Sequence, residues 1–291
     1  MSTAPHPTRV GVVGGGQMGT GIAEVAARRG CDVTIVEVDA DRAEAAHQRI
    51  AASIARGVKR SKISQEDADA ALARLTAAHD LSALADRQLV VEAVVERKEA
   101  KLDVFRLLAE IVEDPDAILA SNTSSIPIVE IGAAVGDRSG KVLGLHFFNP
   151  VPVLSLVEVI PSLLTEQAVT DRTWAFVTDV LKKDPIKAPD RAGFTVNALL
   201  IPYLLSAIRM LEQGLASAKD IDEGMVKGCA HPMGPLALSD LIGLDTVLGV
   251  AETLYAEQRE QLFAPPALLQ RLVAAGRLGR KTGHGLYDYA G

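Results

Sequence analysis

Two residues with the chemistry of a proton-transfer pair lie in neighbouring apolar segments of the 291-residue sequence. His146 stands near the end of the run 142–148, and Glu158 lies inside the run 156–160. Histidine is the usual general base near neutral pH, although a lone histidine in an apolar strand is more often structural. A carboxylate inside an apolar strand is unfavourable unless it is paired. We therefore predict that Glu158 pairs with His146, fixes the tautomer of the imidazole and stabilises its protonated form.

A glycine-rich segment near the N-terminus has the spacing of a dinucleotide-binding loop. Residues 14–19 read Gly-Gly-Gly-Gln-Met-Gly and fit G-x-G-x-x-G, between a predicted strand and a predicted helix. The first glycine permits a tight turn, the second lets the backbone approach a pyrophosphate, and the third lets the helix pack on the strand. The N–H groups that begin such a helix attract phosphates. The predicted cofactor contacts are Gly14, Gly16, Gln17, Met18 and Gly19.

An acidic residue at the end of the second predicted strand indicates which dinucleotide is bound. Glu37 stands at the spacing where a carboxylate accepts hydrogen bonds from the adenosine ribose. This charge would repel the additional phosphate of NADP, and Asp39 and Asp41 add to the repulsion. The predicted cofactor is therefore NAD.

Several polar residues lie at the ends of predicted elements, where two roles are possible. Residues 121–125 read Ser-Asn-Thr-Ser-Ser and follow a short apolar run. Their hydroxyls can bind a substrate oxygen, and they can equally cap the helix that Pro127 begins. Asn197, at the start of a long apolar helix, is either a cap or a site amide. The residues alone leave both questions open.

A basic stretch interrupts the otherwise acidic chain. It contains Arg56, Lys59, Arg60 and Lys62. Cations suit the C-terminal end of a helix dipole, so a solvated helix end explains them. The alternative is a phosphate grip on a bulky anion such as coenzyme A. Composition alone favours the solvated helix end.

The order of apolar and amphipathic segments predicts an α/β fold with a doubly wound, Rossmann-type sheet. The predicted strands are 9–14, 32–37, 88–95, 117–120, 142–148 and 156–160. The predicted helices of this part are 16–29, 40–56, 64–76, 97–112, 127–135 and 166–182. The second and third of these helices are expected to form an inserted helical hairpin.

The pattern changes near residues 184–189, after which no further strand is expected. Helices are predicted at 197–211, 218–227, 235–248 and 266–275. The expected domains are a Rossmann-type domain, 1–189, and a smaller all-helical C-terminal domain, 190–291. The helix 197–211 is apolar around much of its surface, so it is either central in the domain or buried against another subunit. We expect a homodimer formed through this domain.

Composition excludes several classes of protein. The net charge of −7 gives no general attraction to nucleic acid or to an anionic membrane surface. No apolar run approaches the roughly 20 residues that span a bilayer, and the N-terminus lacks the apolar core of a secretory signal. The cysteines Cys31 and Cys229 lack metal-binding spacing, and no histidines have ligand spacing either. We expect a cytoplasmic protein with free thiols and no metal site.

Taken together, seven segments resemble the 3-hydroxyacyl-CoA dehydrogenase family, and most closely its short monofunctional bacterial 3-hydroxybutyryl-CoA dehydrogenases. The resemblance covers nearly the whole chain and is highly specific. The segments are 10–19, 91–96, 120–125, 145–152, Gly193-Phe194 with Val196-Asn197, 232–235 and 279–283.

The resemblance implies roles that the residues alone left open. It implies a catalytic pair of His146 and Glu158, with the reacting oxygen of the substrate held by Ser124 and Asn197. It implies further cofactor contacts on the nicotinamide side and elsewhere, at Glu96, Lys101, Ser124 and Lys281. It also implies that coenzyme A is gripped by Ser53 and Arg60, which favours the phosphate-grip interpretation of the basic stretch.

The activity that the resemblance implies is hydride transfer between NAD and a short-chain (S)-3-hydroxyacyl-CoA. The reaction pair is 3-hydroxybutyryl-CoA and acetoacetyl-CoA, as in fatty-acid or butanoate metabolism. One alternative is a related dehydrogenase of a free hydroxy acid or sugar acid, against which Phe147, Phe148 and the basic stretch argue. The other is a non-catalytic NAD-binding protein, against which four intact residues argue, namely His146, Glu158, Ser124 and Asn197.

Overall fold

The computed structural model describes residues 6–289 and divides the chain into two compact units, Met1–Arg191 and Ala192–Gly291. The boundary expected at residue 189 lies close to this division. Each unit has a hydrophobic core of its own. The expectation about a secretory signal rests partly on residues 1–5, which lie outside the described residues.

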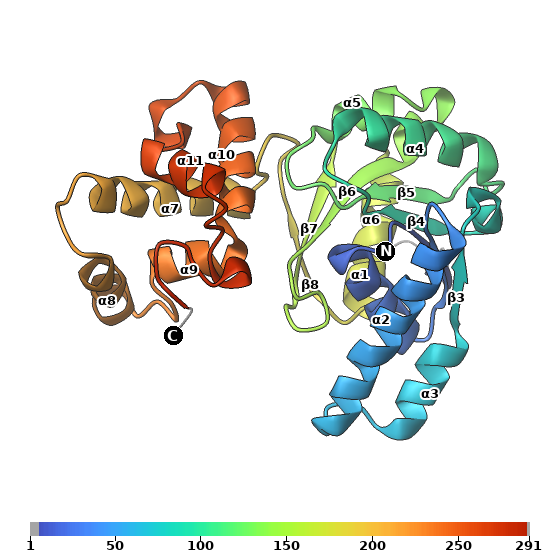
Figure 1. Cartoon of the computed structure of the whole chain (residues 1–291). Coiled ribbons are helices and arrows are strands. Elements are labelled where there is room, and N and C mark those ends of the chain that lie inside the picture. The colour runs from blue at the N-terminus through green and yellow to red at the C-terminus, as the bar shows by residue number, and fades with distance from the viewer. Residues whose placement is uncertain (1–5, 290–291) are drawn as a thin grey trace. The chain divides into compact units, whose positions relative to one another are not determined.

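Within residues 6–289, eight strands form one sheet in the first unit, in the order β3-β2-β1-β4-β5-β6-β7-β8 (Figure 1). The strands are β1 (Arg9–Val13), β2 (Asp32–Val36), β3 (Leu75–Ala78), β4 (Leu89–Glu92), β5 (Ile118–Ser121), β6 (Val142–Phe147), β7 (Leu156–Pro161) and β8 (Asp184–Lys187). Neighbouring strands pair in parallel, except that β6 and β7 are antiparallel. The strand order reverses between β1 and β4, which is where open α/β sheets bind dinucleotides.

Helices cover both faces of the sheet. They are α1 (Gln17–Arg28), α2 (Ala40–Lys59), α3 (Gln65–Ala73), α4 (Lys98–Ile111), α5 (Ile128–Ala133) and α6 (Gln167–Ala175), with the short helices η1 (Leu81–Leu84), η2 (Gly136–Lys141) and the π-helical η3 (Phe176–Val180). The larger core joins residues of α1, α2, α3 and α6 to alternate strand positions such as Val12, Leu145 and Val159. Because side chains alternate along a strand, the intervening positions face the side that carries α4 and α5.

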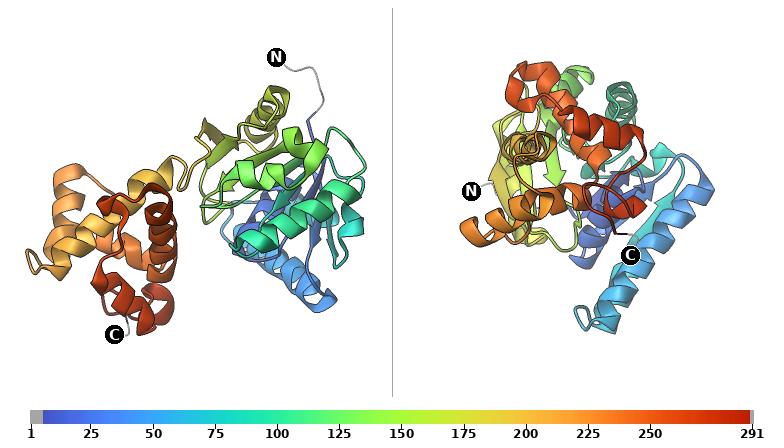
Figure 2. Two further views of the ribbon diagram at one scale, coloured as in Figure 1. Left: turned by 90° about the horizontal axis from the view of Figure 1, so that it is seen from above. Right: turned by 60° about the vertical axis from the view of Figure 1, so that its left-hand side comes forward.

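The main difference from the predicted elements lies at the two edges of the sheet. The predicted helix 64–76 ends early, and residues 75–78 form β3 instead. β8 is not among the predicted strands; it lies within the segment 184–189 where the pattern changes, and no strand follows it among the described residues. β8 contains Pro185, which cannot donate a backbone hydrogen bond and is therefore tolerated at a sheet edge. The expected helical hairpin of α2 and α3 is present, and it projects from the unit in Figure 1 and in the right-hand view of Figure 2.

The second unit is helical. Its elements are α7 (Val196–Glu212), α8 (Ala218–Cys229), α9 (Pro235–Ile242), α10 (Leu244–Gln258) and α11 (Ala267–Ala274), with η4 (Gln261–Phe263) and η5 (Arg280–Thr282). The prediction of one helix over 235–248 is wrong, because Gly243 has φ +103° and separates α9 from α10. The core of this unit includes Leu204, Ile208, Leu236 and Leu254.

Across residues 6–289, none of the helices combines the length and the apolar character that crossing a membrane would require.

Candidate active site

The antiparallel register of β6 and β7 places His146 directly opposite Glu158. The Nδ1 atom of His146 lies 2.7 Å from Oε2 of Glu158. Both residues are buried, with exposed fractions of 7% and 0%. The imidazole also packs on Phe148, with the ring centroids 4.6 Å apart. The pair predicted from the sequence is therefore brought together, with the carboxylate on the Nδ1 side of the ring.

The strand pairing also brings this pair near other polar side chains. Glu92 at the end of β4 stands opposite Ser121 at the end of β5, and Ser121 stands opposite Gly144 in β6. His146 lies two residues beyond Gly144, so its side chain points to the same face. These residues form a polar row along the carboxyl ends of β4, β5 and β6, where ligands bind in sheets of this kind.

The glycine loop leaves room for a phosphate group at the start of α1. Gly14 has φ +99°, and a Cβ atom on Gly16 would meet no atom within 4 Å. A Cβ atom on Gly19 would lie 1.8 Å from the carbonyl oxygen of Gly14, so only glycine allows this close packing. The first turn of α1 has no capping side chain and no acidic residue. Its N–H groups and positive dipole end therefore suit a pyrophosphate. Gln17 and Met18, the other predicted contacts, form this first turn.

The carboxylate of Glu37 is held against the glycine loop. Its Oε1 atom accepts a hydrogen bond from the N–H of Gly15 at 2.7 Å, and Oε2 accepts from the N–H of Val38 at 3.1 Å. Arg49 of α2 donates to the carbonyl oxygen of Gly15 at 2.7 Å. Gly15, between the first two glycines of the motif, is thus held at both its N–H and its carbonyl group, beside an acidic group at the carboxyl end of β2.

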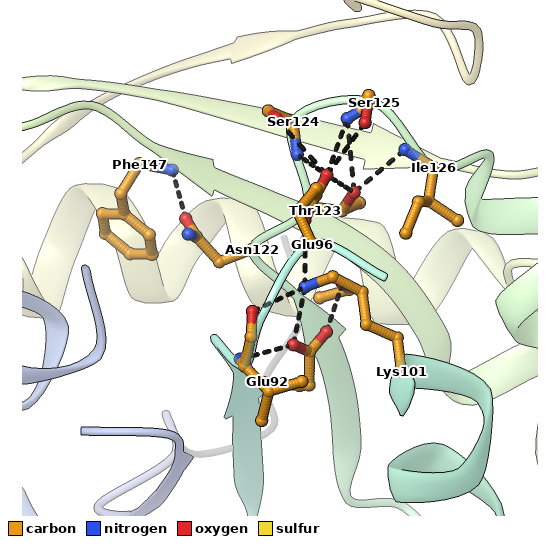
Figure 3. A network of polar contacts seen from close by, with 11 residues as sticks. Glu92, Glu96, Lys101, Asn122, Thr123, Ser124, Ser125, Ile126 and Phe147 are labelled. Atoms are coloured by element: carbon orange, nitrogen blue, oxygen red, sulfur yellow. Dashed lines mark hydrogen bonds and ion pairs between the residues drawn. The ribbon is translucent and has the colours of Figure 1, made fainter. Parts of the chain in front are cut away.

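The hydroxyl-rich loop that follows β5 is organised around Glu96, as Figure 3 shows. The Oε1 atom of Glu96 accepts hydrogen bonds from Thr123 Oγ1 at 2.5 Å, Ser124 N at 2.8 Å and Ser125 Oγ at 3.0 Å. The Ser124 hydroxyl lies 3.3 Å from the same oxygen. Asn122 accepts a hydrogen bond from the N–H of Phe147 at 2.9 Å, which ties the start of this loop to the strand of His146.

Lys101 is entirely buried, and its ammonium group contacts two carboxylates of the site. Its Nζ atom lies 2.7 Å from Glu92 Oε1 and 3.2 Å from Glu96 Oε2. Sequence reasoning placed Lys101 beside the cofactor and overlooked Glu92, which reads as one residue of an apolar strand. An acidic residue inside an apolar run was the available signal, and it was the same signal that identified Glu158.

A cavity of about 340 Å³ extends beside the glycine loop. Its lining includes Gln17 and Thr20 of α1, Ser53 and Arg56 of α2, and Pro150 shortly after β6. Of the two residues predicted to grip coenzyme A, Ser53 lines this cavity. Arg60 instead follows the last turn of α2 and is exposed, outside the lining.

The other two predicted site residues belong to the helical unit. Asn197 is the second residue of α7 and is half-buried. Lys281 lies in η5, and its Nζ atom is 2.6 Å from both carboxylate oxygens of Asp245.

Known proteins of one family match this chain over nearly its whole length. The family description "3-hydroxyacyl-CoA dehydrogenase, NAD binding domain" matches residues 9–191, and its C-terminal domain matches residues 193–289. A 3-hydroxybutyryl-CoA dehydrogenase of Mycobacterium tuberculosis is 53% identical over 281 residues, which is 97% of this chain and 98% of that protein. Another from Bradyrhizobium diazoefficiens is 42% identical, covering 97% and 96%.

A solved structure gives the same result. The (S)-3-hydroxybutyryl-CoA dehydrogenase of Ralstonia eutropha superposes with a TM-score of 0.93 at 41% identity, covering 98% of this chain and 100% of that one. The resemblance inferred from the sequence motifs and the prediction of NAD as cofactor are confirmed. The chain belongs to the 3-hydroxyacyl-CoA dehydrogenase family, and its first unit is the NAD-binding domain.

Proposed function

We propose that the protein interconverts short-chain (S)-3-hydroxyacyl-CoA and 3-ketoacyl-CoA thioesters, with 3-hydroxybutyryl-CoA and acetoacetyl-CoA as the reaction pair. The observation that carries the proposal is the buried contact of 2.7 Å between His146 and Glu158 at the carboxyl edge of an NAD-binding sheet. The names of the relatives in Mycobacterium tuberculosis and Ralstonia eutropha support this substrate class.

His146 is the proton acceptor in the oxidative direction. Glu158 engages Nδ1, so the imidazole takes the C3 hydroxyl proton at Nε2. Bound NAD would supply the acceptor for the hydride that leaves C3. The buried carboxylate then stabilises the imidazolium, as the acid does in a Ser-His-Asp triad. In the reductive direction the imidazolium returns this proton to the carbonyl oxygen of the 3-ketoacyl group.

The remaining predicted residues hold the substrate and the cofactor. Ser124 and Asn197 orient the reacting oxygen of the substrate. The start of α1 holds the pyrophosphate of NAD, and Glu37 holds the adenosine ribose. The carboxyl ends of β4 and β5, with Glu96, would hold the nicotinamide on the other side of the point where strand order reverses.

The coenzyme A part of the substrate occupies the cavity beside α2. Ser53 and Arg56 line this cavity, and Arg49 lines it as well, so two guanidinium groups meet a ligand that carries several phosphates. Arg60 acts one turn further along, as a more distant positive charge at the exposed end of α2.

Loss of NADH absorbance after addition of acetoacetyl-CoA tests the proposal. We expect rapid oxidation of NADH, much slower oxidation of NADPH because of Glu37, and none with free acetoacetate. A series of longer 3-ketoacyl-CoA substrates then gives the preferred acyl length. Turnover of free acetoacetate at a comparable rate would favour a free-acid dehydrogenase. NADH binding without turnover on any acyl-CoA would favour a non-catalytic protein.

We also propose a cytoplasmic homodimer that associates through the helical unit. Large apolar side chains are exposed on this unit, and a second copy would cover them. They are Leu199, Met210, Leu215, Val226, Leu241 and Leu262. Sedimentation equilibrium should give twice the mass of the chain, and replacement of Leu199 and Leu215 by Ser should shift it towards the monomer. A monomeric wild-type protein at micromolar concentration would contradict this assembly.

A further inference from the structure

Glu92 is a buried carboxylate that joins three segments of the first unit. Oε1 accepts hydrogen bonds from the N–H of Val94 and from Lys101 Nζ, both at 2.7 Å. Oε2 accepts from Ser121 Oγ at 2.6 Å. Its side chain is fully buried. Both oxygens of this buried carboxylate therefore have the hydrogen-bond donors that burial of such a group requires.

Lys101 transmits the effect of Glu92 to Glu96. The ammonium group is fully buried and lies between the two carboxylates, 2.7 Å from Glu92 and 3.2 Å from Glu96. Two carboxylates therefore share one cation, and the cluster of Glu92, Lys101 and Glu96 carries a formal charge of minus one. We refer to these three residues as the buried charge cluster.

Glu96 is the member of the buried charge cluster that reaches solvent, since 36% of its side chain is exposed. Burial raises the pKa of Glu96, but the charge of Lys101 and the hydrogen bonds from Thr123, Ser124 and Ser125 outweigh burial and lower it. Glu96 is therefore anionic at neutral pH. Its charge faces the loop that carries Ser124, at the carboxyl ends of β4 and β5.

The two forms of the cofactor differ in charge at this place. The oxidised nicotinamide ring is a cation, and the reduced ring is neutral. A fixed negative charge nearby attracts the first form and has little effect on the second. The effect is larger in a partly buried site than in water, because screening is weaker there.

We propose that Glu92, acting through Lys101 and Glu96, sets the charge at this edge of the sheet and thereby favours binding of the oxidised over the reduced cofactor. Glu92 is a positioning residue, since three protein groups surround its carboxylate and it touches no ligand itself. The inference rests on the proposed function in one respect, namely that the nicotinamide lies over β4 and β5.

The test compares the dissociation constants of NAD+ and NADH for two variants of Glu92. One variant changes the charge of the side chain, and the other changes its length. Glu92→Gln keeps the length of the side chain and removes its charge, so the ratio of the NAD+ to the NADH dissociation constant should rise roughly threefold to tenfold. Glu92→Asp keeps the charge and shortens the side chain. Its ratio should stay at the wild-type value even if both affinities fall. Glu99→Gln, an exposed neutralisation on α4, is the matched control and should leave the ratio unchanged.

Equal weakening of both cofactor forms by Glu92→Gln, or an unchanged ratio, would overturn the proposal and leave Glu92 as a purely structural residue. If Glu92→Gln does not fold, the double variant Glu92→Gln with Lys101→Met restores a net charge of minus one and should have the wild-type ratio; an altered ratio there counts against the proposal. Binding is measured without acyl-CoA, so a wild-type protein that binds both cofactor forms but turns over no thioester would contradict only the proposed function.

Discussion

At the scale of residues, the site consists of carboxylates that each have partners; Glu92 and Glu158 are fully buried, and Glu96 is partly exposed. Glu158 faces His146, Glu92 faces Ser121 and Lys101, and Glu96 holds the loop after β5. Each of these charges would be strongly unfavourable in an apolar sheet without its partners. The partners therefore fix where each carboxylate lies, and each carboxylate in turn fixes a group that acts on the ligand.

Replacement of either member of the reactive pair should affect turnover much more than cofactor binding. His146→Gln removes the proton acceptor, and Glu158→Gln removes the charge that stabilises the imidazolium. We expect each to lower kcat by roughly 10² to 10⁴-fold, the usual range for general acid–base catalysis. Steady-state kinetics together with NADH titration by fluorescence measures both effects. A parallel loss of NADH affinity would indicate that the pair is structural.

The pKa of Glu96 predicts how stability depends on pH. Because this pKa is lowered from its ordinary value of 4.5, the folded state favours the ionised form. The stabilising contribution is present above pH 4.5 and is lost as the pH falls through the lower pKa of the folded state. Between pH 6 and pH 3.5, the free energy of unfolding should therefore fall less for Glu96→Gln than for the wild type.

Urea unfolding over this pH range measures the difference, with Glu99→Gln as the exposed control. Identical acid dependence in Glu96→Gln and the wild type would show that other carboxylates account for the loss.

At the scale of elements, the interior strands were predictable and the edges of the sheet were not. The central strands are continuously apolar, as strands covered on both faces must be. β3, by contrast, reads Leu-Thr-Ala-Ala and continues a helical pattern, and β8 reads Asp-Pro-Ile-Lys. Neither edge strand has an apolar signal, since each is covered by fewer neighbours and its conformation comes from pairing with β2 or β7.

The same limit applies to the site. Four features of the site have a local signal in the sequence. The glycine loop has its spacing, Glu37 and His146 lie at strand ends, and Glu158 is a charge within an apolar run. The burial of Lys101 has no such signal, because the residue lies in the polar first turns of α4 and its partner Glu92 comes from another element. The burial of such a residue is determined by contacts between separate helices and strands. These contacts cannot be read from a single sequence.

In the helical unit, Asp222 of α8 holds the start of α9. Its carboxylate accepts hydrogen bonds from the N–H groups of Leu236 and Ala237 at 2.8 and 2.9 Å, and from the Tyr287 hydroxyl at 2.8 Å. Asp222→Ala leaves the N–H groups of Leu236 and Ala237 without this partner, whereas the Tyr287 hydroxyl keeps the carbonyl oxygen of Ala218, so the change should lower the free energy of unfolding by about 2–4 kcal/mol. Urea unfolding measures this loss. Glu252→Ala, an exposed change on α10, should stay within about 0.5 kcal/mol of the wild type. A comparable loss in both variants would remove the capping explanation.

At the scale of the whole molecule, the two units have separate cores, Met1–Arg191 and Ala192–Gly291. The pyrophosphate loop, Glu37 and Glu96 all belong to the first unit. The exposed apolar side chains proposed to form the dimer belong to the second. Apart from Lys281, the predicted cofactor contacts lie in the first unit, so the cofactor should stabilise mainly the first unit and protein concentration the second.

Thermal unfolding should resolve these effects by calorimetry. NADH at about 100 times its dissociation constant should stabilise the first unit by about 2.7 kcal/mol. For a domain of this size, this corresponds to a rise in its transition of roughly 5–10 °C. The transition of the helical unit should instead rise with protein concentration, because association stabilises it. One transition that responds equally to both variables would show that the units unfold together.

The antiparallel pairing of β6 and β7 has a consequence for the order in which the site assembles. His146 and Glu158 are 12 residues apart in the chain, whereas Glu92 and Ser121 are 29 apart and are joined by way of a helix. The entropy lost on closing a loop grows with its length, and distant parallel pairings form slowly. The reactive pair therefore needs the shorter closure, and it can come together within one hairpin before the parallel strands around it have found their neighbours.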